Sequence, residues 1–276
     1  MKKFTLNCKG VPLPVEHPMV MGIINCTPDS FYDGGKYLNV EVVLKQAEEM
    51  LQAGASILDI GGMSTRPNAT TISEEQEIQN IAPSIEKIHS YFPQALISVD
   101  TFRSKVAETA IQLGASIIND ISGGTEDDKI FDIAAKYHCP YILMHRRGTF
   151  DTMHRPIKYV DFLSDILDDF NKQLKKAITA GVHDIIIDPG FGFSKSIEQN
   201  FYLLKNLHIL EQLGRPIVAG LSRKSMLYKL LETTPDEVLN ATTAANMVAL
   251  MQGAAILRVH DVKAAAESIK LYNQIA

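Results

Sequence analysis

Cysteine is scarce in this sequence, and its three cysteines lie far apart. Cys8, Cys26 and Cys139 are odd in number and form no Cys-x-x-Cys pair. A disulfide framework needs paired cysteines, and a structural zinc site needs clustered cysteines or histidines. The pattern therefore argues against both kinds of site and is typical of reduced thiols. We predict a cytoplasmic location.

An excess of basic residues is also missing. The 276 residues carry 27 lysines and arginines against 32 aspartates and glutamates, a formal net charge of −5 at pH 7. The sequence pI is about 5.9. Proteins that neutralise many phosphates usually carry a basic stripe or a surplus of lysine and arginine. This charge balance argues against a nucleic-acid partner.

No segment has the character of a leader peptide or a membrane anchor. Lys2 and Lys3 stand at the start, but residues 7–9 interrupt the apolar run before a signal-peptide core could form. The longest uncharged stretch, 238–257, reaches membrane-spanning length but contains asparagine, threonine, glutamine and glycine. We interpret it as a helix followed by a strand of a soluble protein. Neither secretion nor a membrane partner is expected.

Apolar residues make up 46% of the chain and gather in eight short β-rich runs with longer amphipathic segments between them. The runs cover residues 20–26, 57–61, 96–100, 116–120, 141–145, 184–188, 216–221 and 255–259. The amphipathic segments cover residues 40–53, 74–91, 104–113, 129–137, 162–180, 198–213 and 241–252. Each segment is long enough for the helix that must connect two parallel strands.

This alternation predicts an α/β protein that folds as a single (β/α)8 TIM barrel, whose typical length is roughly 250 residues. Gly54, Gly114 and Gly181 follow helical segments, where glycine adopts the left-handed conformation that ends a helix. An open, doubly wound sheet is the alternative. No linker or change in composition divides the chain, so we predict one domain over residues 1–276, with a short N-terminal extension at 1–18.

Polar residues close several of the predicted strands. Asp100, Asn119 and Asp188 each end an apolar run, and Arg258 lies in the last run. In a barrel these positions fall at the C-terminal ends of the strands, where such folds place their active sites. Taken singly, Asp100 could cap a helix, Asp188 could serve a turn, and Arg258 could be a surface charge. Their repetition at the same end of successive strands favours a site.

Common catalytic signatures are missing. Gly190 and Gly192 are followed by Lys195 where a dinucleotide fingerprint needs a third glycine, and no strand-linked P-loop is present. Ser222 is followed by Lys224 where a nucleophile elbow needs glycine, and no His-Glu-x-x-His occurs. Nucleotide-binding, serine hydrolase and zinc protease interpretations are therefore excluded.

The remaining polar residues combine carboxylates, an amide and cations. Carboxylates only accept hydrogen bonds, lysine only donates them, and asparagine does both, so together they can bind the edge of a polar heterocycle. Lysine and arginine also donate to phosphate oxygens. Because side chains alternate along a strand, Arg258 and His260 share one face. A ligand with a heterocycle and an anionic group is predicted for the set Asp100, Asp188, Asn119, Arg66, Lys224 and Arg258.

Seven ordered motifs give the chain a family resemblance from about residue 19 to its end. They are residues 21–35 (MGIINCTPDSFYDGG), 64–67 (STRP), 98–103 (SVDTFR), 118–120 (IND), 188–193 (DPGFGF), 222–225 (SRKS) and 258–260 (RVH). In this combination and order the sequence resembles the dihydropteroate synthases of the pterin-binding enzyme family. Seven motifs in order are far more specific than any one of them.

The resemblance implies a transferase of folate biosynthesis and a target of sulfonamides. Such an enzyme joins (7,8-dihydropterin-6-yl)methyl diphosphate to 4-aminobenzoate and releases diphosphate with Mg2+ present. The resemblance, together with the uncharged helical segment 241–252, also predicts a homodimer. A pterin-dependent methyltransferase and a non-catalytic pterin-binding paralogue are the alternatives. The methyltransferase would not need the diphosphate-binding residues that the motifs at 64–67 and 258–260 supply.

The matching positions imply three groups of site residues. The pterin group is Asp100, Asn119, Asp188 and Lys224, with Met144 packed near the ring. The diphosphate and metal group is Arg66, Arg258 and His260, with Asn25 as the metal ligand. The aminobenzoate group is Thr65, Pro67, Phe193 and Ser225. The residues expected to carry catalysis are Asp100, Lys224, Arg258 and His260.

The expected mechanism ionises the bond between the pterin methylene and the diphosphate. Mg2+ with Arg66, Arg258 and His260 stabilises the leaving group, and Asp100 stabilises the pterin cation. The neutral aromatic amine is already nucleophilic, so no general base is assigned. The sequence departs from the commonest family pattern at four positions, which concern loop conformation more than reaction type: Met63, Arg146, Phe150 and Ser194.

Overall fold

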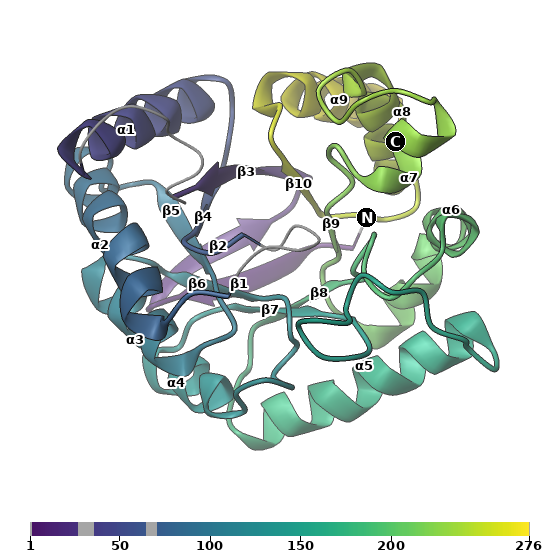
Figure 1. Cartoon of the computed structure of the whole chain (residues 1–276), viewed down its shortest axis with the longest axis horizontal. Helices are drawn as coiled ribbons and strands as arrows, with labels where there is room; N and C mark the ends of the chain where they lie inside the picture. The colour runs from purple at the N-terminus through teal and green to yellow at the C-terminus, as the bar shows by residue number, and fades with distance from the viewer. Residues whose placement is uncertain (1, 27–35, 65–70, 276) are drawn as a thin grey trace.

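Eight parallel strands form the centre of the molecule, which the computed structural model describes over residues 2–26, 36–64 and 71–275. The strands are β3 (Met19–Asn25), β4 (Ile57–Gly61), β5 (Leu96–Asp100), β6 (Ile117–Asp120), β7 (Tyr141–Met144), β8 (Ile185–Asp188), β9 (Val218–Ala219) and β10 (Ile256–Val259). They pair in the order β8-β7-β6-β5-β4-β3-β10-β9, and a bridge between Ile187 and Ile217 joins the two edges. The predicted (β/α)8 barrel is confirmed, and the open sheet is wrong (Figure 1).

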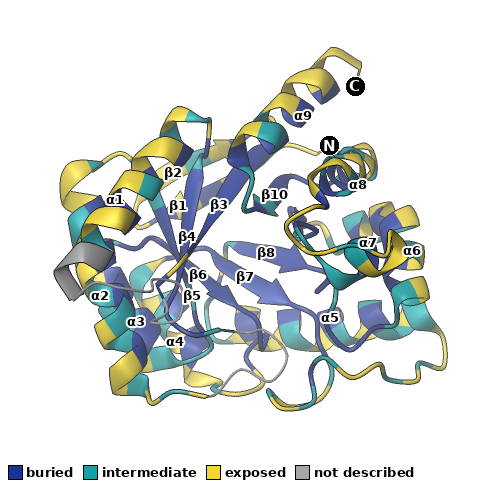
Figure 2. Cartoon of the chain, turned by 45° about the horizontal axis from the view of Figure 1, so that its top comes forward, coloured by how far each residue is buried: buried dark blue, intermediate teal, exposed yellow. Residues whose placement is uncertain are grey.

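Helices connect these strands and surround them (Figure 1). They are α1 (Lys36–Gln52), α2 (Glu74–Tyr91), α3 (Ser104–Leu113), α4 (Lys129–Tyr137), α5 (Phe162–Thr179), α6 (Ile197–Lys205), α7 (Ser225–Leu230), α8 (Leu239–Met251) and α9 (Val262–Ile275). Figure 2 shows the strands buried and the outward faces of the helices exposed. Among the described residues, no helix combines the length and the apolar character that crossing a membrane requires.

Two predicted elements differ from the structure. The segment 198–213, predicted as one helix, is divided into α6 and a 3-10 helix, η2 (Leu207–Leu213). The break lies at Asn206, whose backbone leaves the helical region and whose side-chain amide donates to the Tyr202 carbonyl at 2.8 Å. The predicted strand 216–221 is shortened to β9, because Pro216 has no N–H to donate to a ladder.

An antiparallel hairpin precedes the barrel and consists of β1 (Phe4–Cys8) and β2 (Val11–Val15). Its buried side chains Leu6, Cys8 and Val15 pack in one cluster with residues near the N-terminal ends of the barrel strands, including Ile57 and Ile117. The hairpin therefore covers that end of the barrel. The C-terminal ends of the strands remain as the mouth. The division into one domain at 1–276 with an extension at 1–18 stays a prediction.

A glycine follows three of the helices and turns the chain toward the next strand, as predicted. Gly54, Gly114 and Gly181 have φ angles of 105°, 126° and 94°. At Gly114 a Cβ atom would lie 2.4 Å from the His89 ring, so the position also requires the absence of a side chain. These three turns connect their helices directly to the next strands. Short connections of this kind keep the strand ends in a common layer.

Candidate active site

Register alone brings several predicted residues into one layer at the barrel mouth. Asn25 pairs with Gly61, Gly61 with Asp100, and Asp100 with Asn119, in parallel ladders across four neighbouring strands. Farther around the barrel, Met144 pairs with Asp188. The sequence prediction that the strand ends gather these residues is therefore correct for the described part of the chain.

Arg258 connects this layer across the barrel. Its Nε donates to Asp59 Oδ2 at 2.7 Å, and its terminal nitrogen donates to Asp100 Oδ2 at 2.6 Å. Asn119 Nδ2 donates to the same Asp59 oxygen at 3.0 Å. The four side chains come from β10, β4, β5 and β6, so a single polar network links four of the eight strands. The interpretation of Arg258 as a surface charge is wrong, because its side chain is only 20% exposed.

Asp59 is the functional candidate that sequence reasoning missed. It is fully buried in β4, and its Oδ1 atom has no hydrogen-bond partner among the described residues. A buried carboxylate oxygen without a donor is costly, so such an atom points to a ligand that supplies the donor. The signal was available in the sequence: Asp59 interrupts the apolar run Ile57–Gly61 with a charge that a buried strand would otherwise not hold.

Burial sets the charge state of this network. The pKa of Asp100 is raised to about 7. Desolvation is the main cause, Arg258 opposes the shift, and the nearby Asp59 adds to it. Burial also disfavours the charged form of Arg258, but Asp59 and Asp100 outweigh this effect and raise its pKa. Arg258 therefore remains a cation, while Asp100 can bind or release a proton near neutral pH.

Asp188 and Lys224 form the second charged part of the mouth. Desolvation raises the pKa of Asp188, and it lowers the pKa of Lys224 to about 8, an effect that Arg258 reinforces. Lys224 Nζ lies 4.4 Å from the centroid of the Phe193 ring, which places the cation over an aromatic face. These residues, with Asn119, Ile121, Met144, Gly190, Phe191, Gly220 and Arg258, line a cavity of about 40 Å³.

His260 lies after β10 and contacts a serine of the neighbouring turn. Its Nδ1 lies 3.0 Å from Ser222 Oγ, and its backbone N–H donates to the same oxygen at 3.2 Å. Burial, followed by the charges of Arg258 and Arg223, lowers the pKa of His260 to about 4. His260 is therefore neutral at pH 7, so it can donate a hydrogen bond but carries no charge there.

The remaining predicted residues fall into two groups. Asn25 is exposed at the end of β3, and Ser225 is the first residue of α7. The predicted residues Thr65, Arg66 and Pro67 lie outside the described residues.

Over residues 2–26, 36–64 and 71–275, no group of three or more histidine, cysteine, aspartate or glutamate side chains could hold a metal ion. Because Mg2+ usually keeps only one or two protein ligands beside water and phosphate oxygens, Asn25 suits an ion that binds together with a phosphate group.

Three of the departures from the family pattern have structural roles in the loops. Buried Arg146 donates to the Ile121 and Gly148 carbonyls and to Glu126 Oε1. The rings of Phe150 and Phe102 lie 5.6 Å apart. Ser194 adopts a left-handed φ of 50°, and its Oγ accepts a hydrogen bond from the Arg147 N–H at 2.8 Å. The fourth, Met63, is buried after β4.

Comparison with known proteins gives a consistent result along the chain. The family model described as pterin binding enzyme matches residues 21–260. Dihydropteroate synthase from Clostridium beijerinckii is 43% identical over 250 residues, which cover 90% of this chain and 90% of the relative. Dihydropteroate synthase from Bacillus subtilis is 42% identical over 258 residues, which cover 93% of this chain and 88% of the relative.

Solved structures of similar proteins agree with this family model. Dihydropteroate synthase from Yersinia pestis, solved as a sulfonamide drug complex, superimposes with a TM-score of 0.92 at 38% identity and covers 99% of both chains. The Xanthomonas albilineans dihydropteroate synthase with 4-aminobenzoic acid superimposes with a TM-score of 0.91 at 36% identity, covering 99% of this chain and 98% of that chain.

Proposed function

Since this chain belongs to the pterin-binding enzyme family, among its dihydropteroate synthases, we propose the following route from its site residues to the condensation. The enzyme is a transferase that joins (7,8-dihydropterin-6-yl)methyl diphosphate to 4-aminobenzoate, giving 7,8-dihydropteroate and diphosphate. The observation that carries the proposal is the buried Asp59 oxygen without a donor, beside Asp100, Asn119 and Arg258. The acceptors of this set, the two carboxylates and the Asn119 amide oxygen, match the donor-rich edge of a pterin ring.

The pterin is bound by the deep polar layer. Asp59, Asp100 and Asp188 accept from the ring N–H groups, Asn119 both donates and accepts, and Lys224 donates to a ring oxygen or nitrogen. Support comes from their burial together and from the raised pKa values of Asp100 and Asp188 in the free protein. Donors on the ring would hold these carboxylates in the charged form.

The diphosphate lies toward the strand ends, where Arg258 lies in β10, His260 follows that strand and Asn25 ends β3. Arg66, from the motif at 64–67, completes this group in the proposal. Arginine suits phosphate because its planar guanidinium presents several donors to the oxygens at once. Mg2+ bound by Asn25 and the phosphate oxygens would neutralise negative charge on the leaving diphosphate.

4-Aminobenzoate binds beside Phe193 and Ser225, with Thr65 and Pro67 completing its pocket. The ring of Phe193 already lies against the Lys224 ammonium, so an aromatic substrate can pack beside an ordered aromatic side chain. The similar protein from Xanthomonas albilineans, with 4-aminobenzoic acid present, supports this choice of second substrate.

Charge stabilisation at both ends of the breaking bond drives the chemistry. As the methylene–diphosphate bond ionises, negative charge grows on the diphosphate beside Arg66, Arg258 and His260. Positive charge spreads into the pterin ring, where Asp100 stabilises it. The neutral amine of 4-aminobenzoate then forms the new carbon–nitrogen bond and loses a proton to water or to the diphosphate. No protein nucleophile is required.

We also propose that the enzyme is a cytoplasmic homodimer. The helix α8 holds no charged residue over Leu239–Met251, yet Val248 and Met251 are 42% and 66% exposed. An exposed apolar helix face is stabilised when a second subunit covers it. The three reduced cysteines support a reducing compartment.

The test of this function is a direct condensation assay. The purified chain is mixed with the pterin diphosphate, 4-aminobenzoate and Mg2+, and dihydropteroate and diphosphate are quantified. Equal amounts of the two products are expected, with no dihydropteroate when 4-aminobenzoate is omitted and a slower reaction when EDTA removes Mg2+. A folded chain that binds the pterin but forms no dihydropteroate would overturn the proposal and indicate a non-catalytic paralogue.

A further inference from the structure

A second buried lysine, Lys195, lies directly behind the aminobenzoate side of the mouth. The residue is 4% exposed. Its Nζ lies 3.1 Å from the carbonyl oxygens of both Gly190 and Phe193, and 3.4 Å from the carbonyl oxygen of His145. Burial lowers the pKa of Lys195 to about 7, and both forms of the amine can donate. This one group therefore connects the end of β7 to both ends of the turn that follows β8. No part of the mechanism described above uses it.

The His145 ring fixes the position of this ammonium. Lys195 Nζ lies 3.1 Å from His145 Nδ1, and His145 Nε2 lies 3.3 Å from Asp169 Oδ2 on α5. Burial, followed by the charge of Lys195, lowers the pKa of His145 to about 4. The ring is therefore neutral at pH 7, and these partners assign Nδ1 as the acceptor and Nε2–H as the donor.

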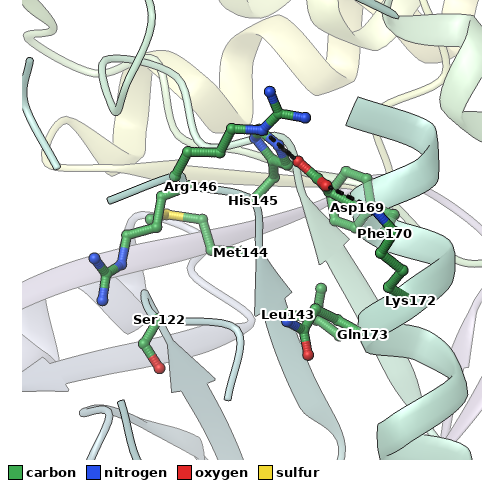
Figure 3. A pocket seen from close by; sticks show the side chains of 10 residues that line it. Ser122, Leu143, Met144, His145, Arg146, Asp169, Phe170, Lys172 and Gln173 are labelled. Atoms are coloured by element: carbon green, nitrogen blue, oxygen red, sulfur yellow. Dashed lines mark hydrogen bonds and ion pairs between the residues drawn. The ribbon is translucent and has the colours of Figure 1, made fainter. Parts of the chain in front are cut away.

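A cavity borders His145 and Asp169 on the side of α5. It measures about 170 Å³ and is lined by residues of β7, of α5 and of the loop after β6 (Figure 3). Figure 3 shows His145 and Asp169 close together at its edge. Arg147 Nε donates to the same Asp169 oxygen at 2.6 Å. The His145 ring is therefore held by its polar contacts together with packing against the Phe170 ring, whose centroid lies 5.7 Å away.

The turn that Lys195 holds is the one that presents Phe193. Gly190 has a φ of 67°, and a Cβ there would lie 2.0 Å from the His145 carbonyl oxygen, so the two loops touch backbone to backbone. The Phe193 N–H donates back to the Gly190 carbonyl at 3.1 Å. The Phe193 ring then packs with Ile121, Met144 and Met153 in a small apolar cluster.

We propose that Lys195 is a positioning residue for the aminobenzoate half of the site. Its ammonium holds the turn 190–193 against the end of β7 and so places the Phe193 ring beside Lys224. The backbone of Asp188 is held within the barrel by β7. Its Oδ1 accepts from the Gly190 N–H of the same turn at 2.7 Å. Pterin binding should therefore change less than aminobenzoate binding. This inference rests on the proposed condensation and deepens it.

The test separates the two substrates. In Lys195→Met, which keeps the side-chain length but removes the donors, the KM for 4-aminobenzoate at saturating pterin diphosphate should rise on the order of tenfold or more. The Kd of the pterin diphosphate, measured by calorimetry, should stay within about threefold of the parent value. Lys195→Arg, which retains a cationic donor, should recover part of the loss in KM.

Two further variants keep the test decisive. Tyr141→Phe removes a buried hydroxyl that donates to Asp120, away from the turn, and should lower stability without changing the KM for 4-aminobenzoate. If Lys195→Met does not fold, Asp169→Asn, which weakens the contact that holds His145, should still raise this KM by a smaller factor. An unchanged KM in the folded variants, or an equal loss of pterin binding, would overturn the inference. A parent enzyme without condensation activity would instead overturn the proposed function.

Discussion

Arg258 and Asp100 belong to strands that two others separate, and a contact of 2.6 Å joins the guanidinium to the carboxylate. Both belong to the proposed site, one on the diphosphate side and one on the pterin side. In the free protein each satisfies the other, which keeps a buried charge paired. A substrate that separates the two groups would have to supply each with a partner of comparable strength.

Arg258→Ala should slow bond cleavage as well as weaken substrate binding. Removing the guanidinium takes away donors to the departing diphosphate, for which a rate loss of about 10² to 10³ is expected. It also leaves Asp59 and Asp100 buried without their cation, with a cost of about 3 to 5 kcal/mol in unfolding free energy. The measurement is single-turnover diphosphate release at saturating substrate, with folding checked by circular dichroism.

Two variants control this experiment. Arg258→Lys should recover only part of the rate, because a point charge does not reproduce the multiple donors of the guanidinium. Val259→Ile, at the next residue, changes a buried side chain of the main apolar core and should leave catalysis nearly unchanged. Diphosphate release at the parent rate from folded Arg258→Ala would remove Arg258 from the reaction.

Asp100→Ala should mainly destroy pterin binding. The loss of two charge-assisted hydrogen bonds, each about 1.5 to 3 kcal/mol, corresponds to an affinity loss on the order of 10² to 10⁴. Asp100→Asn keeps the shape and one acceptor, so its loss should be smaller. Calorimetry on the folded variants gives both values, and unchanged pterin affinity in Asp100→Ala would place Asp100 outside the site.

The buried histidines His260 and His145 should each contribute a loss of stability as the pH falls from 6.5 to 4. The pKa of His260 is lowered from 6.5 to about 4 in the folded state, so in this window the unfolded chain binds more protons. Asp100 acts in the opposite direction, since its raised pKa favours the folded state as the pH falls from about 7. His145 has the same sign as His260.

His260→Asn isolates one of these contributions. Between pH 7 and pH 5, urea unfolding should show a stability loss about 2 kcal/mol smaller in this variant than in the parent. The matched control is His17→Asn, at an exposed position, which should keep the full parent difference. Equal pH dependence in His260→Asn and the parent would show that His260 does not become protonated on unfolding.

The dimer proposal predicts that charges on α8 separate the subunits. Met251→Glu combined with Val248→Glu would place two like, unpaired charges in a buried apolar contact, which costs several kcal/mol and should yield a monomer near 30.5 kDa by light scattering. Val160→Lys, at a fully exposed position after β7, should leave the mass of the parent unchanged. A parent protein that is monomeric at every concentration would refute the dimer.

The periodic parts of the fold were predictable because each strand is an apolar run, and β3, β5, β6 and β8 end in polar residues. Asn25, Asp100, Asn119 and Asp188 all lie at strand ends as the pattern predicts. Asp59 was missed because it lies two residues before its strand end, where only the curvature of the barrel brings it to Arg258.

Lys195 was missed for a different reason. The sequence shows it only as the residue that breaks a glycine fingerprint, and its partners are main-chain carbonyls on two loops. Carbonyl groups carry no sequence signal, since every residue has one. The break between α6 and η2 was missed likewise, because one asparagine in an amphipathic segment does not by itself predict a helix end.

The hairpin of β1 and β2 has a consequence for how substrates enter and products leave the enzyme. Since it covers the N-terminal end of the barrel, both substrates must enter and both products must leave through the same opening. A bound product therefore blocks the next pair of substrates until it departs. Dihydropteroate occupies the pterin and aminobenzoate positions at once. Its release, rather than the binding of either substrate, therefore sets the upper limit on how soon the next pair of substrates can bind.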